Sequence, residues 1–205
     1  MIIKVCGLRD PANIRAVDRL AIDLAGFIFY PRSPRCVPDD ELHAETVRNC
    51  RKPAVGVFVD ASPEEMLRIA GRFGLGWLQL HGDESPETCK ALRQQGYRII
   101  KAIRVATAAD LVTTGVYEGC VDYLLFDTRC DGYGGSGQRF DWTVLDAYTG
   151  SVPFLLSGGL DAECAEAVKG FAHPRFAGVD LNSGFETAPA VKDAGKLEKF
   201  ISKIQ

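Results

Sequence analysis

The chain has 205 residues, of which 46% are hydrophobic and 25% charged, so it can bury a sizeable core, and disorder is excluded. Its formal net charge of -3 argues against a general nucleic-acid or anionic-membrane surface, because such partners require a cationic field. The sequence has no uncharged apolar stretch of about 18 residues, so it predicts neither a membrane span nor a signal peptide.

Short apolar runs recur along the chain at intervals of roughly 25 residues, which is typical of repeated supersecondary units. The runs are apolar almost throughout instead of alternating, as expected of strands that are buried on both faces of a parallel sheet. In chain order the eight runs are Ile2–Val5, Gly26–Phe29, Ala54–Val59, Trp77–Leu80, Ile99–Ile103, Tyr123–Phe126, Val152–Leu156 and Gly178–Leu181.

Segments with helical spacing and helix-start signals lie between these runs, as crossovers in a parallel sheet require. Ser62 and Pro63 offer a cap and a first-turn proline for a helix whose apolar stripe is Met66, Ile69, Ala70 and Phe73. Similar starts occur at Asp10-Pro11, Ser85-Pro86 and Asp161-Ala162-Glu163, and a stripe of Ala194, Leu197, Ile201 and Ile204 marks the last helix.

Eight strand–helix units fit either an open doubly wound sheet or a closed barrel, and the even spacing favours the barrel. No linker is visible. The sequence therefore predicts an α/β fold, a single (β/α)₈ TIM-barrel domain over residues 1–205 with eight parallel strands and surrounding helices.

Polar residues follow nearly every apolar run, at the end of a barrel where active sites are built. Strand by strand they are Cys6, Tyr30 leading to Arg35, Asp60, Gln79 with His81, Arg104, Asp127, Ser157 and Asn182. Some of these side chains are expected only to cap the following helix, and Asp60 is interpreted as such a cap.

Three glycine-containing stretches come late in the chain: Gly134-Gly135-Ser136-Gly137, Ser157-Gly158-Gly159 and Asn182-Ser183-Gly184. Glycine lets backbone N–H groups approach an oxyanion closely, and the loops after the last two strands form the usual phosphate site of this fold. Each stretch alone is equally well explained as a tight turn. Two in the expected loops favour a phosphorylated substrate.

Cys6 and Asp127 are the candidate catalytic pair. A free cysteine is commonly just a small buried hydrophobe, but a thiolate beside a cation such as Lys4, Lys101 or Arg104 is a competent base. Asp127 is interpretable as a helix cap, as an ion-pair partner, or as an acid across the barrel mouth. Arg35, in a loop stiffened by Pro34, has a guanidinium suited to a planar carboxylate.

The seven cysteines are an odd, scattered set without a CxxC pair, and this indicates reduced thiols and a cytoplasmic location. The three histidines are also widely separated, so no zinc-ligand spacing is present. We therefore expect no metal.

Taken together, these residues give the whole chain a resemblance to the phosphoribosylanthranilate isomerase family. The likeness rests on motifs that occur in the family's order: Lys4-Val5-Cys6-Gly7, Gly26-Phe27-Ile28-Phe29 with Ser33-Pro34-Arg35, Gln79-Leu80-His81-Gly82, Asp127-Thr128, Gly134-Gly135-Ser136-Gly137, Ser157-Gly158-Gly159-Leu160 and Asp180-Leu181-Asn182-Ser183-Gly184. Ser136 stands where threonine is frequent and Asn182 where serine is frequent, and both keep a polar group. Cys36 has no assigned role.

The resemblance implies an Amadori rearrangement of N-(5-phosphoribosyl)anthranilate to 1-(2-carboxyphenylamino)-1-deoxyribulose 5-phosphate in tryptophan biosynthesis, without cofactor or metal. Asp127 would protonate the ribose ring oxygen, and Cys6 would remove the C2′ proton. Arg35 would hold the anthranilate carboxylate, and Gln79 and His81 would also bind substrate. The phosphate group is assigned to Gly135, Ser136, Gly137, Gly158, Gly159, Asn182 and Ser183.

Three alternatives remain open. The aminoaldose isomerase of histidine biosynthesis would have an aspartate in place of Cys6, and indole-glycerol-phosphate synthase would need a Lys/Glu catalytic set and a longer N-terminal extension. A barrel that binds a phosphorylated metabolite without converting it would leave Cys6 and Asp127 inert. The expected partner is a small phosphorylated substrate, with no nucleic acid or membrane, and the expected state is a monofunctional monomer or homodimer.

Overall fold

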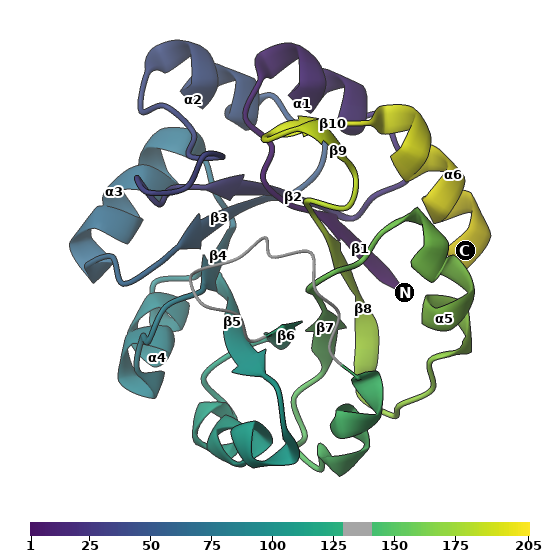
Figure 1. Cartoon of the computed structure of the whole chain (residues 1–205). Coiled ribbons are helices and arrows are strands. Elements are labelled where there is room, and N and C mark those ends of the chain that lie inside the picture. The colour runs from purple at the N-terminus through teal and green to yellow at the C-terminus, as the bar shows by residue number, and fades with distance from the viewer. Residues whose placement is uncertain (129–140) are drawn as a thin grey trace.

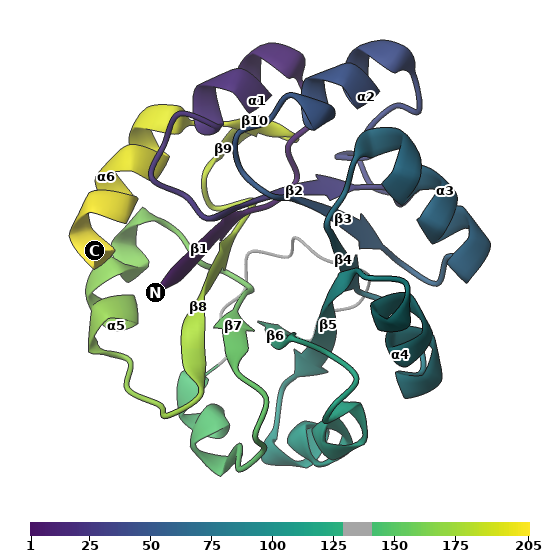
Figure 2. The ribbon, with the colours of Figure 1, turned by 180° about the vertical axis from the view of Figure 1, so that it is seen from behind.

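A computed structural model of the chain describes residues 1–128 and 141–205. Figures 1 and 2 look along the molecule from opposite ends and show a central ring of strands inside a ring of helices. The strands are β1 (Ile2–Val5), β2 (Leu24–Ile28), β3 (Ala54–Phe58), β4 (Trp77–Leu80), β5 (Arg98–Val105), β6 (Tyr123–Thr128), β7 (Phe154–Leu156) and β8 (Phe176–Leu181).

The eight strands form a closed parallel barrel in sequence order, which confirms the predicted fold. Closure comes from pairing of the first strand with the last, with Val5 opposite Leu181. Each predicted apolar run contains or overlaps one strand, although β5 and β6 extend further toward their carboxyl ends than their apolar residues do.

The α-helices are α1 (Pro11–Val17), α2 (Glu41–Arg48), α3 (Pro63–Phe73), α4 (Pro86–Gln94), α5 (Ala165–Gly170) and α6 (Ala194–Ile204). Asp10, Ser62 and Ser85 cap their helices as predicted, each accepting a hydrogen bond from a backbone N–H of the first turn. Asp161 likewise caps the short η3 (Ala162–Cys164) that leads into α5. The interpretation of Asp60 as a cap was wrong, because Ser62 caps α3, whereas the Asp60 carboxylate accepts from the N–H of Asp83 at 2.7 Å.

The second half of the helical ring is less regular than the sequence suggested. The crossovers after β5 and β6 carry the 3₁₀ segments η1 (Ala108–Tyr117) and η2 (Trp142–Ala147). β-Branched residues and a glycine make η1 a poor α-helix former. A small antiparallel hairpin, β9 (Glu186–Ala188) and β10 (Val191–Lys192), was not predicted, and it follows β8 and lies against α1 (Figure 1).

The side chains inside the barrel change from apolar to polar along the barrel axis. Apolar side chains fill its lower and middle layers: Leu24, Val55, Trp77, Ile100, Ala102, Leu125 and Leu155. Trp77 stacks on Tyr123 and lies under the guanidinium of Arg98, 4.3 Å from the ring centre, near the amino-terminal ends of the strands. A larger apolar core lies between the barrel and its helices. Polar side chains are therefore left to the carboxyl ends of the strands.

Candidate active site

Side chains two residues apart along a strand point to the same face of the sheet. Several strands therefore bring two polar side chains, two positions apart, into the barrel at their carboxyl ends. In each case the first residue of the pair lies on the strand and the second directly follows it: Lys4 and Cys6 at β1, Gln79 and His81 at β4, and Asp180 and Asn182 at β8. Asp127 lies on β6. Lys4, Cys6, Gln79, Asp127 and Asp180 are all buried.

The Cys6 thiol lies beside the ammonium of Lys4. A methyl group added to Gly26 on the neighbouring strand would be 2.9 Å from Cys6 Sγ and 3.1 Å from Lys4 Nζ, so both atoms crowd the same point. Burial raises the pKa of the Cys6 thiol above its usual range. The charges of Lys4 and Lys192 act in the opposite direction and only partly offset burial.

Lys4 is held in place by Asp180, since its Nζ lies 2.8 Å from Asp180 Oδ1 and both side chains are almost fully inaccessible. Burial alone would lower the pKa of Lys4, but the negative charges of Asp180 and Cys6 outweigh it and raise the value. The cation beside Cys6, left open among three candidates by the sequence, is therefore Lys4. Lys101 is instead paired with Glu84 at 3.2 Å.

Asp127 is hydrogen-bonded to His81, whose Nε2 lies 3.2 Å from Asp127 Oδ2. The other ring nitrogen of His81, Nδ1, is 2.8 Å from Gln79 Nε2. The charges of both His81 and Asp127 act on Asp180, which also acts on Cys6. The charge of Asp180 thus influences both the candidate base and a neighbour of the candidate acid through its pairing with Lys4 and its interaction with His81.

Arg35 extends from the loop after β2 to the β9–β10 hairpin. Its Nε and Nη2 donate to Glu186 Oε1 and Oε2 at 2.9 and 2.7 Å, a two-point contact that raises the pKa of Arg35. Lys192 on the same hairpin also binds Glu186, and it donates to Asn182 Oδ1 at 2.8 Å. The guanidinium has the expected carboxylate-binding geometry, but here it binds a carboxylate of the protein itself.

The glycines after β7 and β8 lie in adjoining loops. Gly158 and Gly159 have φ values of 81° and 64°, a backbone conformation that favours glycine. An isolated bridge joins Asp161 to Gly184, and a Cβ on Gly184 would lie only 2.0 Å from the carbonyl oxygen of Leu160. Side chains are thus excluded where the two loops meet.

The predicted phosphate residues are only partly placed by this geometry. Gly158, Gly159 and Ser183 lie in the two adjoining loops, whereas the Asn182 side chain lies over Gly7, close to Lys192. Gly135, Ser136 and Gly137 lie outside the described residues. Within residues 1–128 and 141–205, no group of three His, Cys, Asp or Glu side chains is arranged to hold a metal ion. No helix in that part of the chain is long and apolar enough to cross a membrane.

Sequence reasoning missed three participants: Asp180, Glu186 and Lys192. Asp180 could have been found by the period of two, because it precedes Asn182 by two residues on a predicted strand, as Lys4 precedes Cys6. Glu186 and Lys192 depend on the hairpin, whose strands of 3 and 2 residues have no apolar periodicity to reveal them.

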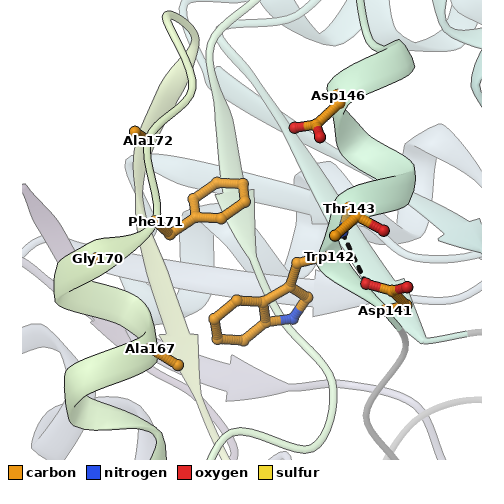
Figure 3. Close-up of a pocket in the computed structure, with 8 residues that line it drawn as sticks. All are labelled: Asp141, Trp142, Thr143, Asp146, Ala167, Gly170, Phe171 and Ala172. Carbon is orange, nitrogen blue, oxygen red and sulfur yellow. Dashed lines mark hydrogen bonds between the residues drawn. The ribbon is translucent and has the colours of Figure 1, made fainter.

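A second pocket, of about 560 Å³, lies in the helical ring between η2 and the end of α5 (Figure 3). The rings of Trp142 and Phe171 meet there edge to face, with centres 5.7 Å apart. Asp141 and Asp146 lie on the same side of the pocket as Trp142, and Phe171 lies across from them (Figure 3). None of the strand-end polar side chains lines it, so it is separate from the candidate active site.

A parallel eight-stranded barrel with a thiol, a carboxyl and a buried cation at the carboxyl ends of its strands defines a TIM-barrel enzyme of the acid–base type. The family model described as N-(5′-phosphoribosyl)anthranilate (PRA) isomerase matches residues 3–203. The chain therefore belongs to the phosphoribosylanthranilate isomerase family, a family of isomerases.

Individual relatives agree with this assignment. The N-(5′-phosphoribosyl)anthranilate isomerase of Parabacteroides distasonis is 56% identical over 206 aligned residues, covering 100% of this chain and 93% of the relative. The crystal structure of the Thermus thermophilus phosphoribosyl anthranilate isomerase superposes with a TM-score of 0.84 at 29% identity, covering 99% and 98% of the two chains. A phosphoribosyl anthranilate isomerase in complex with reduced 1-(o-carboxyphenylamino)-1-deoxyribulose 5-phosphate gives a TM-score of 0.80 at 28% identity, covering 100% and 98%.

Proposed function

We propose that this protein catalyses the Amadori rearrangement of N-(5′-phosphoribosyl)anthranilate to 1-(2-carboxyphenylamino)-1-deoxyribulose 5-phosphate, with Cys6 as general base and Asp127 as general acid. The carrying observation is that both side chains are buried at carboxyl ends of barrel strands, Cys6 beside the ammonium of Lys4 and Asp127 hydrogen-bonded to His81. A related isomerase has been crystallised with the reduced product of this reaction.

The reaction requires one proton to be given and one to be taken. Asp127 protonates the ribose ring oxygen, the bond from that oxygen to C1′ breaks, and the anthranilate nitrogen becomes a protonated Schiff base. Cys6 then removes the C2′ proton, and the electrons of that bond neutralise the Schiff base to give an enolamine. Tautomerisation of the enolamine yields the ketone, so the substrate is rearranged without net gain or loss of atoms.

The ends of the substrate are assigned to separate parts of the site. Arg35 receives the anthranilate carboxylate in place of Glu186, because its two-point contact matches a planar carboxylate. The phosphate lies against the backbone of Gly158, Gly159 and Ser183, with Gly135, Ser136 and Gly137 as the third loop. Asn182, beside Lys192, lies nearer Cys6 and completes the polar lining.

The remaining assignments follow from the same activity. A single barrel domain over residues 1–205 acts in the cytoplasm on a small phosphorylated substrate, without nucleic acid or membrane. The chain is a monomer or a homodimer. A related enzyme from Thermotoga maritima is described as dimeric and has been made monomeric.

Turnover of phosphoribosylanthranilate, followed by its loss of fluorescence, tests this function. Cys6→Ala and Asp127→Asn should each lower kcat by at least about 100-fold, the usual contribution of a positioned acid or base. Two matched controls should retain activity: Cys36→Ala, in the loop after β2, and Asp146→Asn, in the second pocket between η2 and α5. Binding without conversion by the wild-type protein would instead support an inert metabolite-binding barrel.

Growth of a tryptophan auxotroph that lacks this one step tests the function in cells. The wild-type gene should restore growth without tryptophan, and the Cys6→Ala and Asp127→Asn genes should not. Failure of the wild-type gene, with the protein present and folded, would contradict the proposal.

A further inference from the structure

Arg35, Glu186 and Lys192, called the charge cluster below, lie together beside the candidate base. Their side chains are 13%, 6% and 0% exposed, so the carboxylate and both cations are largely shielded from water. A Cβ on Gly7, the residue directly after Cys6, would lie only 2.8 Å from Arg35 Cδ. The same Cβ would lie 3.3 Å from Lys192 Nζ. Both cations therefore approach the chain next to the thiol.

The charge cluster holds more positive than negative charge. Burial alone would raise the pKa of Glu186, but hydrogen bonds from Arg35 and Lys192 outweigh it and hold the value below its usual range, so Glu186 is ionised at neutral pH. Burial lowers the pKa of Lys192, and the pairing with Glu186 offsets this effect only in part. One carboxylate therefore does not fully compensate the two shielded cations, and a second one would be favourable there.

The contact between Arg35 and Glu186 has the form that a substrate carboxylate would need. Arg35 donates from Nε and Nη2 to the two carboxylate oxygens of Glu186, which is the planar two-point pairing of a guanidinium. The proposed function assigns the same guanidinium to the anthranilate carboxylate. Because only 13% of the Arg35 side chain is exposed, a ligand reaches this fork by replacing Glu186 on it.

Glu186 is also held by groups other than Arg35. Its Oε1 accepts from Lys192 Nζ and, at 3.2 Å, from the backbone N–H of Ala190 on the same hairpin. Asn13 on α1 fixes the backbone of Lys192 in turn, since Asn13 Nδ2 donates to the carbonyl of Lys192 and Asn13 Oδ1 accepts from its N–H, both at 2.8 Å. Glu186 thus keeps a cation and a backbone donor when Arg35 is taken away.

We propose that Glu186 is an internal carboxylate that occupies the place of the anthranilate carboxylate at Arg35 until substrate binds. The substrate carboxylate then takes over the fork of Arg35, and Glu186 stays on its hairpin, paired with Lys192. This deepens the proposed function and rests on it. Glu186 and Lys192 act on the substrate through Arg35 and are therefore positioning residues.

The exchange makes affinity depend on a carboxylate in the ligand. An arylamine ring without a carboxylate cannot replace Glu186, so Arg35 remains bound to the hairpin. For a carboxylated ligand, the apparent affinity is the intrinsic affinity reduced by the fraction of protein in which Arg35 is released. Glu186 lowers this fraction. Lys192 raises it, because it compensates the released carboxylate.

Three variants test the exchange through the Kd of reduced 1-(2-carboxyphenylamino)-1-deoxyribulose 5-phosphate, measured by calorimetry without turnover. Glu186→Gln weakens the internal competitor, so the Kd should fall by roughly threefold or more. Lys192→Met leaves the released Glu186 without its cation, so the Kd should rise by roughly tenfold. Combining Glu186→Gln with Lys192→Met should return the Kd to within about threefold of wild type.

The same reduced compound without its carboxyl group is the control ligand, and it should bind wild type and all three variants alike. Glu198→Gln and Lys199→Met, exposed on α6, are the matched control variants and should bind both ligands as wild type does.

Three results would overturn the exchange. A higher Kd in Glu186→Gln would show that Glu186 orients Arg35 and does not compete for it. A Kd that stays high in the double variant would show that Lys192 binds the ligand itself. Equal losses for the two ligands would show general damage to the site.

Carbon NMR of glutamate-labelled wild-type protein does not depend on how well Lys192→Met folds. The Glu186 carboxyl signal, assigned with Glu186→Gln, should move when the carboxylated ligand is added and stay in place with the control ligand. The same movement with both ligands would also overturn the exchange. If the exchange is observed but the wild-type protein fails to convert phosphoribosylanthranilate, the proposed function is overturned instead.

Discussion

Lys4 and Asp180 form a buried ion pair between the first and last strands of the barrel, with Lys4 Nζ 2.8 Å from Asp180 Oδ1. Because Lys4 precedes Cys6 by two residues on the same face, this pair occupies the layer directly below the thiol. The two strands that close the barrel thus also supply the charge environment of the candidate base. The ion pair therefore links the strands that close the barrel to the candidate site.

Removing the cation should damage both stability and activity. Lys4→Met leaves Asp180 as an uncompensated buried carboxylate, at a cost of about 3–5 kcal/mol in the free energy of unfolding. It also removes the charge that favours the Cys6 thiolate, so kcat/KM should fall. Denaturant unfolding and steady-state kinetics measure the two effects on the same protein.

A second substitution separates these effects. Lys4→Met with Asp180→Asn should recover much of the lost stability but not the activity. Lys101→Met breaks another buried pair, with Glu84, and should lower stability without shifting the pH dependence that Cys6 sets. Wild-type kcat/KM in folded Lys4→Met protein would contradict a role for this charge.

The pH dependence of kcat/KM should reflect a thiol that is harder to ionise than a free one. A free cysteine titrates near about 8.5, and burial raises the pKa of Cys6 above its usual range. The pH dependence of kcat/KM reports ionisations of the free enzyme. The fraction of free enzyme in which Cys6 is a thiolate should therefore still be increasing as the pH passes through the neutral range. We expect kcat/KM to keep rising up to at least about pH 8.5.

Kinetics in a series of buffers at constant ionic strength measure this rise. Burial also raises the pKa of the Cys36 thiol. Because Cys36 lies in the loop after β2 and not at the candidate base position, Cys36→Ala should leave the rise of kcat/KM unchanged. If kcat/KM instead reached a plateau below neutral pH, the ionisation that controls its rise would not be that of a buried thiol.

The barrel could be predicted from the sequence because every strand of it is buried on both faces. Runs such as Ala54–Phe58 are apolar at every position, and helix starts such as Ser62-Pro63 are decided by local chemistry. The sequence predicted individual candidate site residues but not which of them contact one another. The position of Cys6 at a strand end is local, but the partners of its sulfur are set by the closure of the barrel.

The contacts that the sequence could not predict are long-range or weakly patterned. Arg35 binds Glu186 across 151 positions, through a hairpin too short to have periodicity. The Gln79–His81 contact is local, yet the orientation of an amide depends on what surrounds it. Motifs therefore placed the candidate residues at the carboxyl ends of the strands, whereas the pairing of their charges needed coordinates.

Replacing Arg35 by lysine tests the geometry of its guanidinium group separately from its charge. Arg35→Lys keeps the positive charge but loses the fork that binds two carboxylate oxygens, so KM should rise by roughly tenfold while kcat changes little. Arg9→Lys is the matched control, because Arg9 is exposed and donates to the carbonyl of Pro34, away from Glu186. Equal KM values for the two variants would remove Arg35 from carboxylate binding.

Gly184 tests whether the loops after β7 and β8 must touch to bind phosphate. In Gly184→Ala the new Cβ would lie 2.0 Å from the backbone oxygen of Leu160, so the two loops must separate. Losing one charge-assisted backbone hydrogen bond to the phosphate costs about 1.5–3 kcal/mol, so KM should rise by roughly 10-fold to 100-fold. Inhibition by inorganic phosphate should weaken in parallel.

Gly71→Ala provides the contrast, because Gly71 lies inside α3 and a Cβ there meets nothing within 4 Å. Alanine at this position should raise the free energy of unfolding by about 0.5–1 kcal/mol, and KM should not change. Thermal unfolding of both variants, measured with and without phosphate, completes the comparison: phosphate should stabilise wild type and Gly71→Ala but much less so Gly184→Ala. Equal stabilisation of all three proteins would show that phosphate binds without the contact between these loops.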